Sequence, residues 1–169
     1  MAKIGLFYGS DTGNTEAAAE EIQELMGADL LEVFNIANSS ASDFGGFDHL
    51  IIGCPTWNIG ELQSDWDGFF SELDGIDFSG KKIAYFGCGD QVGYSDNFVD
   101  AIGILEAKIT ERGGKTIGYW STEGYEFDES KALRNGKFVG LALDETNQSD
   151  LTEQRLKKWV MLLRAEFGV

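Results

Sequence analysis

The sequence predicts an α/β fold in which a doubly wound, five-stranded parallel sheet carries helices on both faces. Two observations support this prediction. Short apolar runs alternate with amphipathic helical patterns along the chain, as expected for parallel strands joined by crossover helices. The 169 residues, of which 43% are hydrophobic, are enough to fill one core. We therefore expect a single domain over residues 1–169.

Five apolar runs mark the strands of this sheet. They cover Ile4–Tyr8, Leu30–Phe34, Phe47–Gly53, Lys82–Gly87 and a fifth strand that begins at Thr116–Trp120. The fifth strand is interrupted, because Ser121–Lys137 is polar and irregular before Phe138–Leu143 resumes a strand pattern. We interpret Ser121–Lys137 as an insertion within the fifth strand. A loop of this length is uncommon in a compact domain and is a candidate for a functional role.

Four stripes of apolar residues at helical spacing mark the helices. The first contains Ala18, Ile22, Leu25 and Met26, the second Leu62, Trp66, Phe69, Phe70 and Leu73, the third Phe98, Ala101, Ile102, Leu105 and Ile109, and the last Leu156, Trp159, Val160, Leu163 and Phe167. Stripes of this kind usually pack into a core. We expect these side chains to be structural and not to bind a cofactor.

Negative charge is concentrated in the first half of the chain. The formal net charge is -16, and between Ile4 and Gly80 there are fifteen Asp and Glu residues and no Lys or Arg. Nucleic acid is not an expected partner, because binding to phosphates requires a basic surface. An acidic surface favours electrostatic steering toward basic-faced partner proteins, with association rates that fall as salt rises. The alternative is that the acidity serves only solubility.

Two further features bear on location. No run of eighteen apolar residues is present, and Met1–Ile4 leads into the first strand without a signal-peptide pattern. Cys54 and Cys88 are the only cysteines, too few for a disulfide framework. We expect a monomeric, cytoplasmic protein with reduced thiols and no membrane insertion. If the third and fourth strands are neighbours, Cys54 and Cys88 could still approach disulfide distance.

The loop after the first strand consists of Ser10, Asp11, Thr12, Gly13, Asn14 and Thr15. It contains three hydroxyl groups but no Lys or Arg, whereas loops that hydrolyse nucleotides use a lysine to neutralise the transferred phosphoryl group. Backbone N–H groups, hydroxyls and the positive end of the next helix can hold a phosphate that is only an anchor. The alternative is a turn and helix cap. We expect the Asp11 carboxylate to point to solvent, where it would not repel a phosphate.

Two more loops each carry one aromatic residue among polar residues and glycines. The loop after the third strand, Cys54–Glu61, contains Trp57, and the loop after the fourth, Cys88–Asn97, contains Tyr94. In an open parallel sheet, ligands bind beyond the carboxyl ends of the strands, so the three loops should converge. The two rings could hold a planar ligand between them, unless each packs on its own loop. Together with the phosphate loop, they fit flavin mononucleotide (FMN) best.

The three loops resemble the FMN loops of flavodoxins, and the match extends over nearly the whole chain. The matching segments are Ser10–Thr15, Pro55-Thr56-Trp57-Asn58-Ile59-Gly60 and Gly89-Asp90-Gln91-Val92-Gly93-Tyr94. The insertion resembles that of the long-chain subgroup, found in cyanobacteria and some other bacteria. The resemblance implies the strand order 2-1-3-4-5. It also implies that FMN contacts Ser10–Thr15, Thr56, Trp57, Asn58, Ile59, Gly60, Cys88, Gly89, Asp90, Tyr94 and Asn97.

Specific roles follow from the resemblance. Ser10–Thr15 would bind the FMN phosphate, Trp57 would stack on the inner face of the isoalloxazine ring, and Tyr94 would cover its outer face. The Asn58–Ile59 peptide would contact flavin N5, and Asp90 the pyrimidine edge. The protein would be an electron carrier and not an enzyme. It would use the semiquinone/hydroquinone couple at low potential, because carboxylates without a nearby cation destabilise an anionic hydroquinone.

Flavodoxins of this kind usually substitute for ferredoxin. The resemblance therefore implies basic-faced redox proteins as partners, namely photosystem I, ferredoxin-NADP reductase and, in some organisms, nitrogenase. They would meet the acidic surface near Glu61, Asp65, Asp67 and Asp96.

Four alternative classes of protein fit the sequence less well. A quinone reductase must admit a second substrate over the flavin, where Tyr94 would obstruct it. A phosphotyrosine phosphatase needs an arginine six positions after its cysteine, but Gly60 and Tyr94 stand there after Cys54 and Cys88. A phospho-receiver domain needs an aspartate at the end of the third strand, where Gly53-Cys54-Pro55 stands. A cofactor-free interaction module would leave the three loops unexplained.

Overall fold

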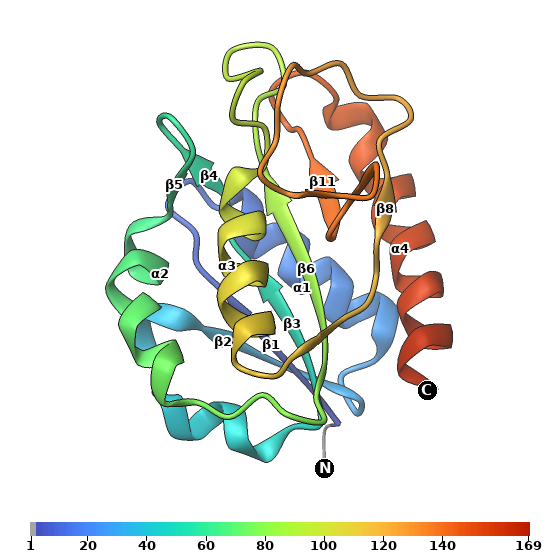
Figure 1. The fold of residues 1–169 in the computed structure, drawn as a ribbon. Coiled ribbons are helices and arrows are strands. Elements are labelled where there is room, and N and C mark those ends of the chain that lie inside the picture. Colours follow the sequence, from blue (N-terminus) through green and yellow to red (C-terminus); the bar gives the residue numbers. More distant parts are fainter. Residues whose placement is uncertain (1–2) are drawn as a thin grey trace.

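The computed structural model describes residues 3–169 and contains the predicted parallel sheet (Figure 1). Its strands are β1 (Ile4–Tyr8), β2 (Leu31–Asn35), β3 (His49–Gly53), β6 (Lys82–Cys88) and β11 (Leu141–Leu143). Their order is β11-β6-β3-β1-β2, and each neighbouring pair is parallel. Counted along the chain, this is the order 2-1-3-4-5, so the predicted fold class is confirmed.

The fifth strand is split as predicted, but its pieces differ from the expected ones. β7 (Lys115–Thr116) pairs with the start of β6, and β11 pairs with its end. Between them, β8 (Trp120–Ser121), β9 (Leu133–Arg134) and β10 (Lys137–Phe138) form a small antiparallel sheet. The prediction that the main strand resumes at Phe138 is therefore wrong. The chain enters the main sheet only after Gly140, where a Cβ would lie 1.9 Å from the carbonyl oxygen of Tyr85.

The four expected helices are α1 (Asn14–Met26), α2 (Ser64–Phe69), α3 (Asp100–Glu111) and α4 (Thr152–Phe167). Short 3-10 helices cover Ile36–Asn38, Ala41–Gly46, Phe70–Gly75 and Ser149–Leu151. Two expected helix starts are wrong. Leu62 belongs to the hairpin of β4 (Thr56–Trp57) and β5 (Glu61–Leu62). The helix α2 begins one residue after Gln63, whose side chain caps it. Phe98 precedes α3, because Val99 has a φ of 48° and interrupts the helical backbone.

Two hydrophobic clusters cover the two faces of the sheet. One cluster packs under α2, α3 and the insertion and includes Phe7, Phe44, Trp66, Tyr85 and Ile102. The other packs under α1 and α4 and includes Leu6, Ile22, Phe86, Trp159 and Leu163. Figure 1 shows the same division, with α2 and α3 on one side of the sheet and α4 on the other. Consecutive strand residues such as Leu6 and Phe7 alternate between the faces, as the pleat requires. Within residues 3–169, no helix is both long and apolar enough to cross a membrane.

His49 lies at the start of β3, far from the loops at the carboxyl edge of the sheet. Its ring centroid is 4.9 Å from that of Phe167, and its Nδ1 is buried without a hydrogen-bond partner. Burial, followed by the charge of Lys82, lowers the pKa of His49 below its ordinary value of 6.5. The His49 side chain is therefore protonated more easily in the unfolded chain than in the folded protein.

We expect the folded protein to lose stability as the pH falls below the ordinary pKa of histidine, with no contribution from His49 above it. Urea unfolding of the wild type and of His49→Gln, near pH 7.5 and near pH 5.5, tests this. The wild type should lose more free energy of unfolding between the two pH values than the variant. Equal losses would show that the pKa of His49 is not lowered in the folded protein.

Candidate functional site

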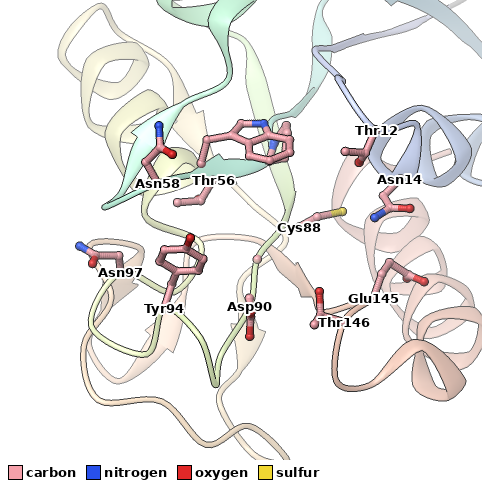
Figure 2. A pocket seen from close by; sticks show the side chains of 13 residues that line it. Thr12, Asn14, Thr56, Asn58, Cys88, Asp90, Tyr94, Asn97, Glu145 and Thr146 are labelled. Atoms are coloured by element: carbon pink, nitrogen blue, oxygen red, sulfur yellow. The ribbon is translucent and has the colours of Figure 1, made fainter.

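A pocket of about 340 Å³ lies at the carboxyl ends of the parallel strands. Loops after β1, β3, β6 and β11 contribute to it, which confirms that the predicted loops converge. The residues that line it are Thr12, Asn14, Pro55, Thr56, Trp57, Asn58, Cys88, Gly89, Asp90, Tyr94, Asn97, Glu145 and Thr146. Figure 2 shows Tyr94, Asn97 and Asn58 at one end, Thr12 and Asn14 at the other, and Cys88 between them.

The first loop leaves the start of α1 open to an anion. Gly13 precedes the helix with a φ of 92°, a backbone conformation that suits glycine, and no side chain caps the helix. The Ser10 hydroxyl accepts a hydrogen bond from the Gly13 N–H at 3.1 Å and shapes the turn. The Thr15 side chain is buried, and its hydroxyl donates to Sγ of Cys88 at 3.7 Å. Unpaired N–H groups at a helix start carry positive potential, which favours a phosphate.

Asp11 is exposed, as expected, but its side chain is also hydrogen-bonded. Its Oδ1 accepts from Nε2 of Gln63 at 3.0 Å, and Gln63 is 0% exposed. The same Nε2 donates to Asp65 at 2.7 Å, and a Cβ on Gly9 would lie 2.1 Å from Oε1 of Gln63. Gln63 thus fastens the first loop to the start of α2. Nothing in the local sequence marks it as buried.

The loop after β3 is a tight hairpin turn. Asn58 and Gly60 both have positive φ, 49° and 80°, and Ile59 is 77% exposed at the tip. The hydroxyl of Thr56 accepts from the Ala101 N–H at 2.9 Å and so ties the hairpin to α3. Trp57 is half-buried, and its Nε1 is buried without a hydrogen-bond partner. Trp57 also lines the pocket, where a flat aromatic side chain can stack on a planar ligand.

The loop after β6 carries a carboxylate held by backbone N–H groups. Oδ1 of Asp90 accepts from the N–H of Gly93 at 2.8 Å and of Val92 at 3.1 Å. The Gly93 contact is the main cause that holds the pKa of Asp90 below its usual value, followed among the lowering contacts by Nδ2 of Asn147. Asp90 is therefore ionised at neutral pH. Tyr94, further along the loop, is 48% exposed beside the pocket.

The two cysteines are free and pack into different clusters. Cys54 belongs to the cluster under α2 and α3, and Cys88 to the one under α1 and α4. The structure does not support a disulfide between them, because their side chains lie on opposite faces of the sheet. Burial raises the pKa of Cys88 to about 12, and it raises the pKa of Cys54 as well. Both thiols stay protonated at neutral pH.

Ten of the predicted site residues line the pocket and six do not. The six, Ser10, Asp11, Gly13, Thr15, Ile59 and Gly60, lie in the same loops and shape them, so their contacts with a ligand stay a prediction. Glu145 and Thr146, which line the pocket, were missed. They follow β11, and the rule that ligands bind beyond the carboxyl ends of strands applies to that strand too. Pro55, in the quoted loop, also lines the pocket.

The fold and the pocket define a nucleotide-binding α/β protein, with an anion-ready helix start at one end of the site and two aromatic residues at the other. The flavodoxin family model matches residues 6–159. A flavodoxin from a Nostoc species is 64% identical over 167 residues, covering 99% of this chain and 98% of that protein. A flavodoxin from a Synechocystis species is 65% identical over 161 residues, covering 95% of each.

The structural comparison agrees with the sequence comparison. The crystal structure of Fusobacterium nucleatum flavodoxin bound to flavin mononucleotide matches with a TM-score of 0.93 and 36% identity, covering 98% of this chain and 99% of that one. The chain belongs to the flavodoxin family, whose members are electron-transfer flavoproteins and not enzymes. The predicted family is thereby confirmed.

Proposed function

We propose that this protein is a low-potential, one-electron carrier that binds FMN non-covalently in the pocket at the carboxyl edge of the sheet. The observation that carries the proposal is the arrangement of the pocket. An uncapped helix start lies at one end, Trp57 and Tyr94 lie at the other, and no Lys or Arg is among the lining residues. FMN supplies the one-electron chemistry when it is bound.

The residues present fit FMN in size and in chemistry. The pocket volume of about 340 Å³ is in the range of small-molecule sites. Thr12, Asn14 and the first N–H groups of α1 would bind the phosphate, and the ring would lie between Trp57 and Tyr94. Asp90 would face the pyrimidine edge. The Asn58–Ile59 peptide, in the turn with positive φ at Asn58, would lie near flavin N5.

The charges around the pocket support a low potential. Asp90 and Glu145 line it, and the nearby first half of the chain carries a strong excess of acidic residues. An added electron would enter a site already surrounded by negative charge, and no lining cation offsets it. The fully reduced, anionic ligand is therefore the state that these residues disfavour most. We infer that the working couple joins the one-electron and two-electron reduced forms of FMN.

We further propose that the protein substitutes for ferredoxin toward basic-faced redox partners, such as photosystem I, ferredoxin-NADP reductase and, in some organisms, nitrogenase. Ile59 and Val92 are 77% and 71% exposed on the two loops that hold Trp57 and Tyr94. Glu61, Asp67 and Asp96 are exposed on the same loops and on α2. An apolar contact surrounded by carboxylates suits docking against a basic face. A monomeric, cytoplasmic protein fits this role, and sedimentation tests the oligomeric state.

Anaerobic, stepwise reduction of the FMN-loaded protein tests the carrier function. We expect the blue, one-electron-reduced flavin to accumulate to most of the total, with full reduction only at a much lower potential. Direct reduction by two electrons, or steady oxidation of NADPH by the purified protein, would favour a flavin enzyme. Absence of FMN binding would favour an interaction module without cofactor.

A further inference from the structure

Two buried carboxylates stand at the two ends of the loop that carries Tyr94. Asp144 follows β11, Asp100 is the first residue of α3, and both are 0% exposed. Among residues 3–169, neither takes part in an ion pair. Burying a charge is costly unless hydrogen bonds compensate it, and here neutral donors do so alone. Because two buried carboxylates lie beside one pocket, we looked for a structural role in the hydrogen bonds that they accept.

At the start of the loop, Asp144 holds Gln91. The backbone N–H and Nε2 of Gln91 both donate to Oδ2 of Asp144, at 3.1 and 2.8 Å. Asn147 donates to the same carboxylate through its backbone N–H at 3.0 Å and through Nδ2 at 2.9 Å. That Nδ2 also lies 2.8 Å from Oδ1 of Asp90, which lines the pocket. Asp144 therefore joins the loop after β6 to the loop after β11.

At the end of the loop, Asp100 holds Asn97. Asn97 lines the pocket, and its Nδ2 donates to Oδ2 of Asp100 at 3.1 Å. The backbone N–H of Lys131, in the insertion, donates to Oδ1 at 2.6 Å. A Cβ on Gly60 would lie 2.6 Å from the same Oδ2, so Asp100 also backs the turn that follows Trp57.

The insertion also forms hydrogen bonds with this loop, at Gln91 and at Ser95. The Glu126 N–H donates to Oε1 of Gln91 at 2.7 Å, and Gln91 is 3% exposed. The N–H groups of Asp128 and Glu129 donate to the Ser95 carbonyl at 2.8 and 3.0 Å. In Figure 1, the loop after β6 and the insertion lie at the same end of the sheet. The loop is thus held at both ends and along one side.

We propose that Asp144 and Asp100 are positioning residues, which hold the Asp90–Asn97 loop in its ligand-binding shape before FMN arrives. The insertion bonds to Asp100 through Lys131 and to Gln91, the partner of Asp144, through Glu126. It therefore helps to order the end of the pocket where the flavin ring would lie. The proposal rests on the proposed function. Tyr94 is 48% exposed, so its own packing does little to order the loop. A loop that is ordered in advance loses less conformational entropy on binding, which raises affinity.

Asp144→Asn and Asp100→Asn test this with almost no change in side-chain size. Each oxygen of Asp144 accepts from a backbone N–H group, that of Gln91 or of Asn147, so the new amide NH2 of Asp144→Asn must face a donor. In Asp100→Asn the side-chain amide of Asn97 can turn its oxygen toward the new NH2, so this substitution should cost less. Asp29→Asn is the matched control. It removes the same charge from an exposed position just before β2, at the opposite edge of the sheet.

Apoprotein of each variant is titrated with FMN, riboflavin and inorganic phosphate. In Asp144→Asn, we expect the Kd for FMN and for riboflavin to rise about tenfold, because a loop that loses a buried hydrogen bond must be ordered by the ligand instead. In Asp100→Asn, we expect the same two Kd values to rise by a smaller factor. The Kd for phosphate should stay within about twofold, because Thr12 and Asn14 bind at the other end. The visible circular dichroism of bound FMN should change in these variants and not in Asp29→Asn. Unchanged riboflavin affinity, or an equal loss for phosphate, would overturn the proposal.

Hydrogen exchange on the wild-type apoprotein gives a test that needs no variant. The amide hydrogens of Gln91 and Lys131, which bond to the two carboxylates, should be protected without FMN. Exchange at the rate of an unstructured peptide would show that the loop is not held before binding and would overturn the proposal. Wild-type protein that fails to bind FMN contradicts the proposed function instead, so the two failures remain distinguishable.

Discussion

We expect Trp66→Ala to lower the free energy of unfolding by about 3–5 kcal/mol, the range for truncating a buried Trp. Trp66 is 0% exposed on α2 and packs edge-on against Phe69, with ring centroids 6.0 Å apart. Its Nε1 donates to the Gly53 carbonyl at 2.8 Å. Alanine would leave a cavity and remove one of the two hydrogen bonds to the Gly53 carbonyl, which also accepts from the Gly9 N–H at 3.1 Å. Urea unfolding of the apoprotein measures the loss.

The loss of free energy of unfolding in Trp66→Ala should come both from the lost side-chain volume and from the lost hydrogen bond. Trp66→Phe keeps most of the volume but loses the hydrogen bond to Gly53, so we expect about 1–2 kcal/mol. Met161→Ala is the surface control, because Met161 is 73% exposed and should change stability by less than about 0.5 kcal/mol. A loss below about 1 kcal/mol for Trp66→Ala would mean that the surrounding core collapses into the space.

The strands and loop ends of the main sheet can be predicted from sequence because the strands are buried on both faces. All five residues of β1 are buried, as are six of the seven of β6, and such continuous apolar runs are typical of parallel strands. Once the ends of β1, β3 and β6 are known, topology alone brings Thr12, Trp57 and Tyr94 to one edge.

The insertion cannot be resolved in the same way. Its strands have two residues each, too few to show a period of two. Phe138 is fully buried against Tyr125 and Phe98, at centroid distances of 5.2 and 5.8 Å, and it looks like a residue of the main sheet. The break between β10 and β11 depends on the close approach at Gly140, which involves the distant Tyr85.

Buried polar residues escape sequence reasoning for a related reason. Gln63, Asp100 and Asp144 are residue types that usually lie on the surface. They can be buried here only because hydrogen bonds to their partners offset the loss of hydration. Those partners come from other loops, such as Asp11 for Gln63 and Gln91 for Asp144. The sequence therefore predicts which side chains line the pocket better than it predicts which side chains order the loops.

Trp57→Ala should weaken FMN binding by about 1–3 kcal/mol, a factor of about five to 150 in Kd, because stacking of a heterocycle on an aromatic side chain has this magnitude. Trp57 is half-buried and lines the pocket, and its ring is part of the hairpin that Thr56 ties to α3. The partner ring, Tyr94, is more exposed, at 48%. Fluorescence titration of the apoprotein with FMN measures the effect.

The matched control is Tyr119→Ala, which removes an aromatic side chain that is 38% exposed and does not line the pocket. Its Kd for FMN should equal that of the wild type within about twofold. Trp57→Phe keeps a stacking face and should recover most of the affinity lost in Trp57→Ala. The reduction potentials give an independent readout, because alanine opens one face of the ring to water, which solvates the anionic, fully reduced form better. The potential of the second electron should therefore become less negative in Trp57→Ala. If affinity and potential both match the wild type, the ring of FMN does not lie against Trp57.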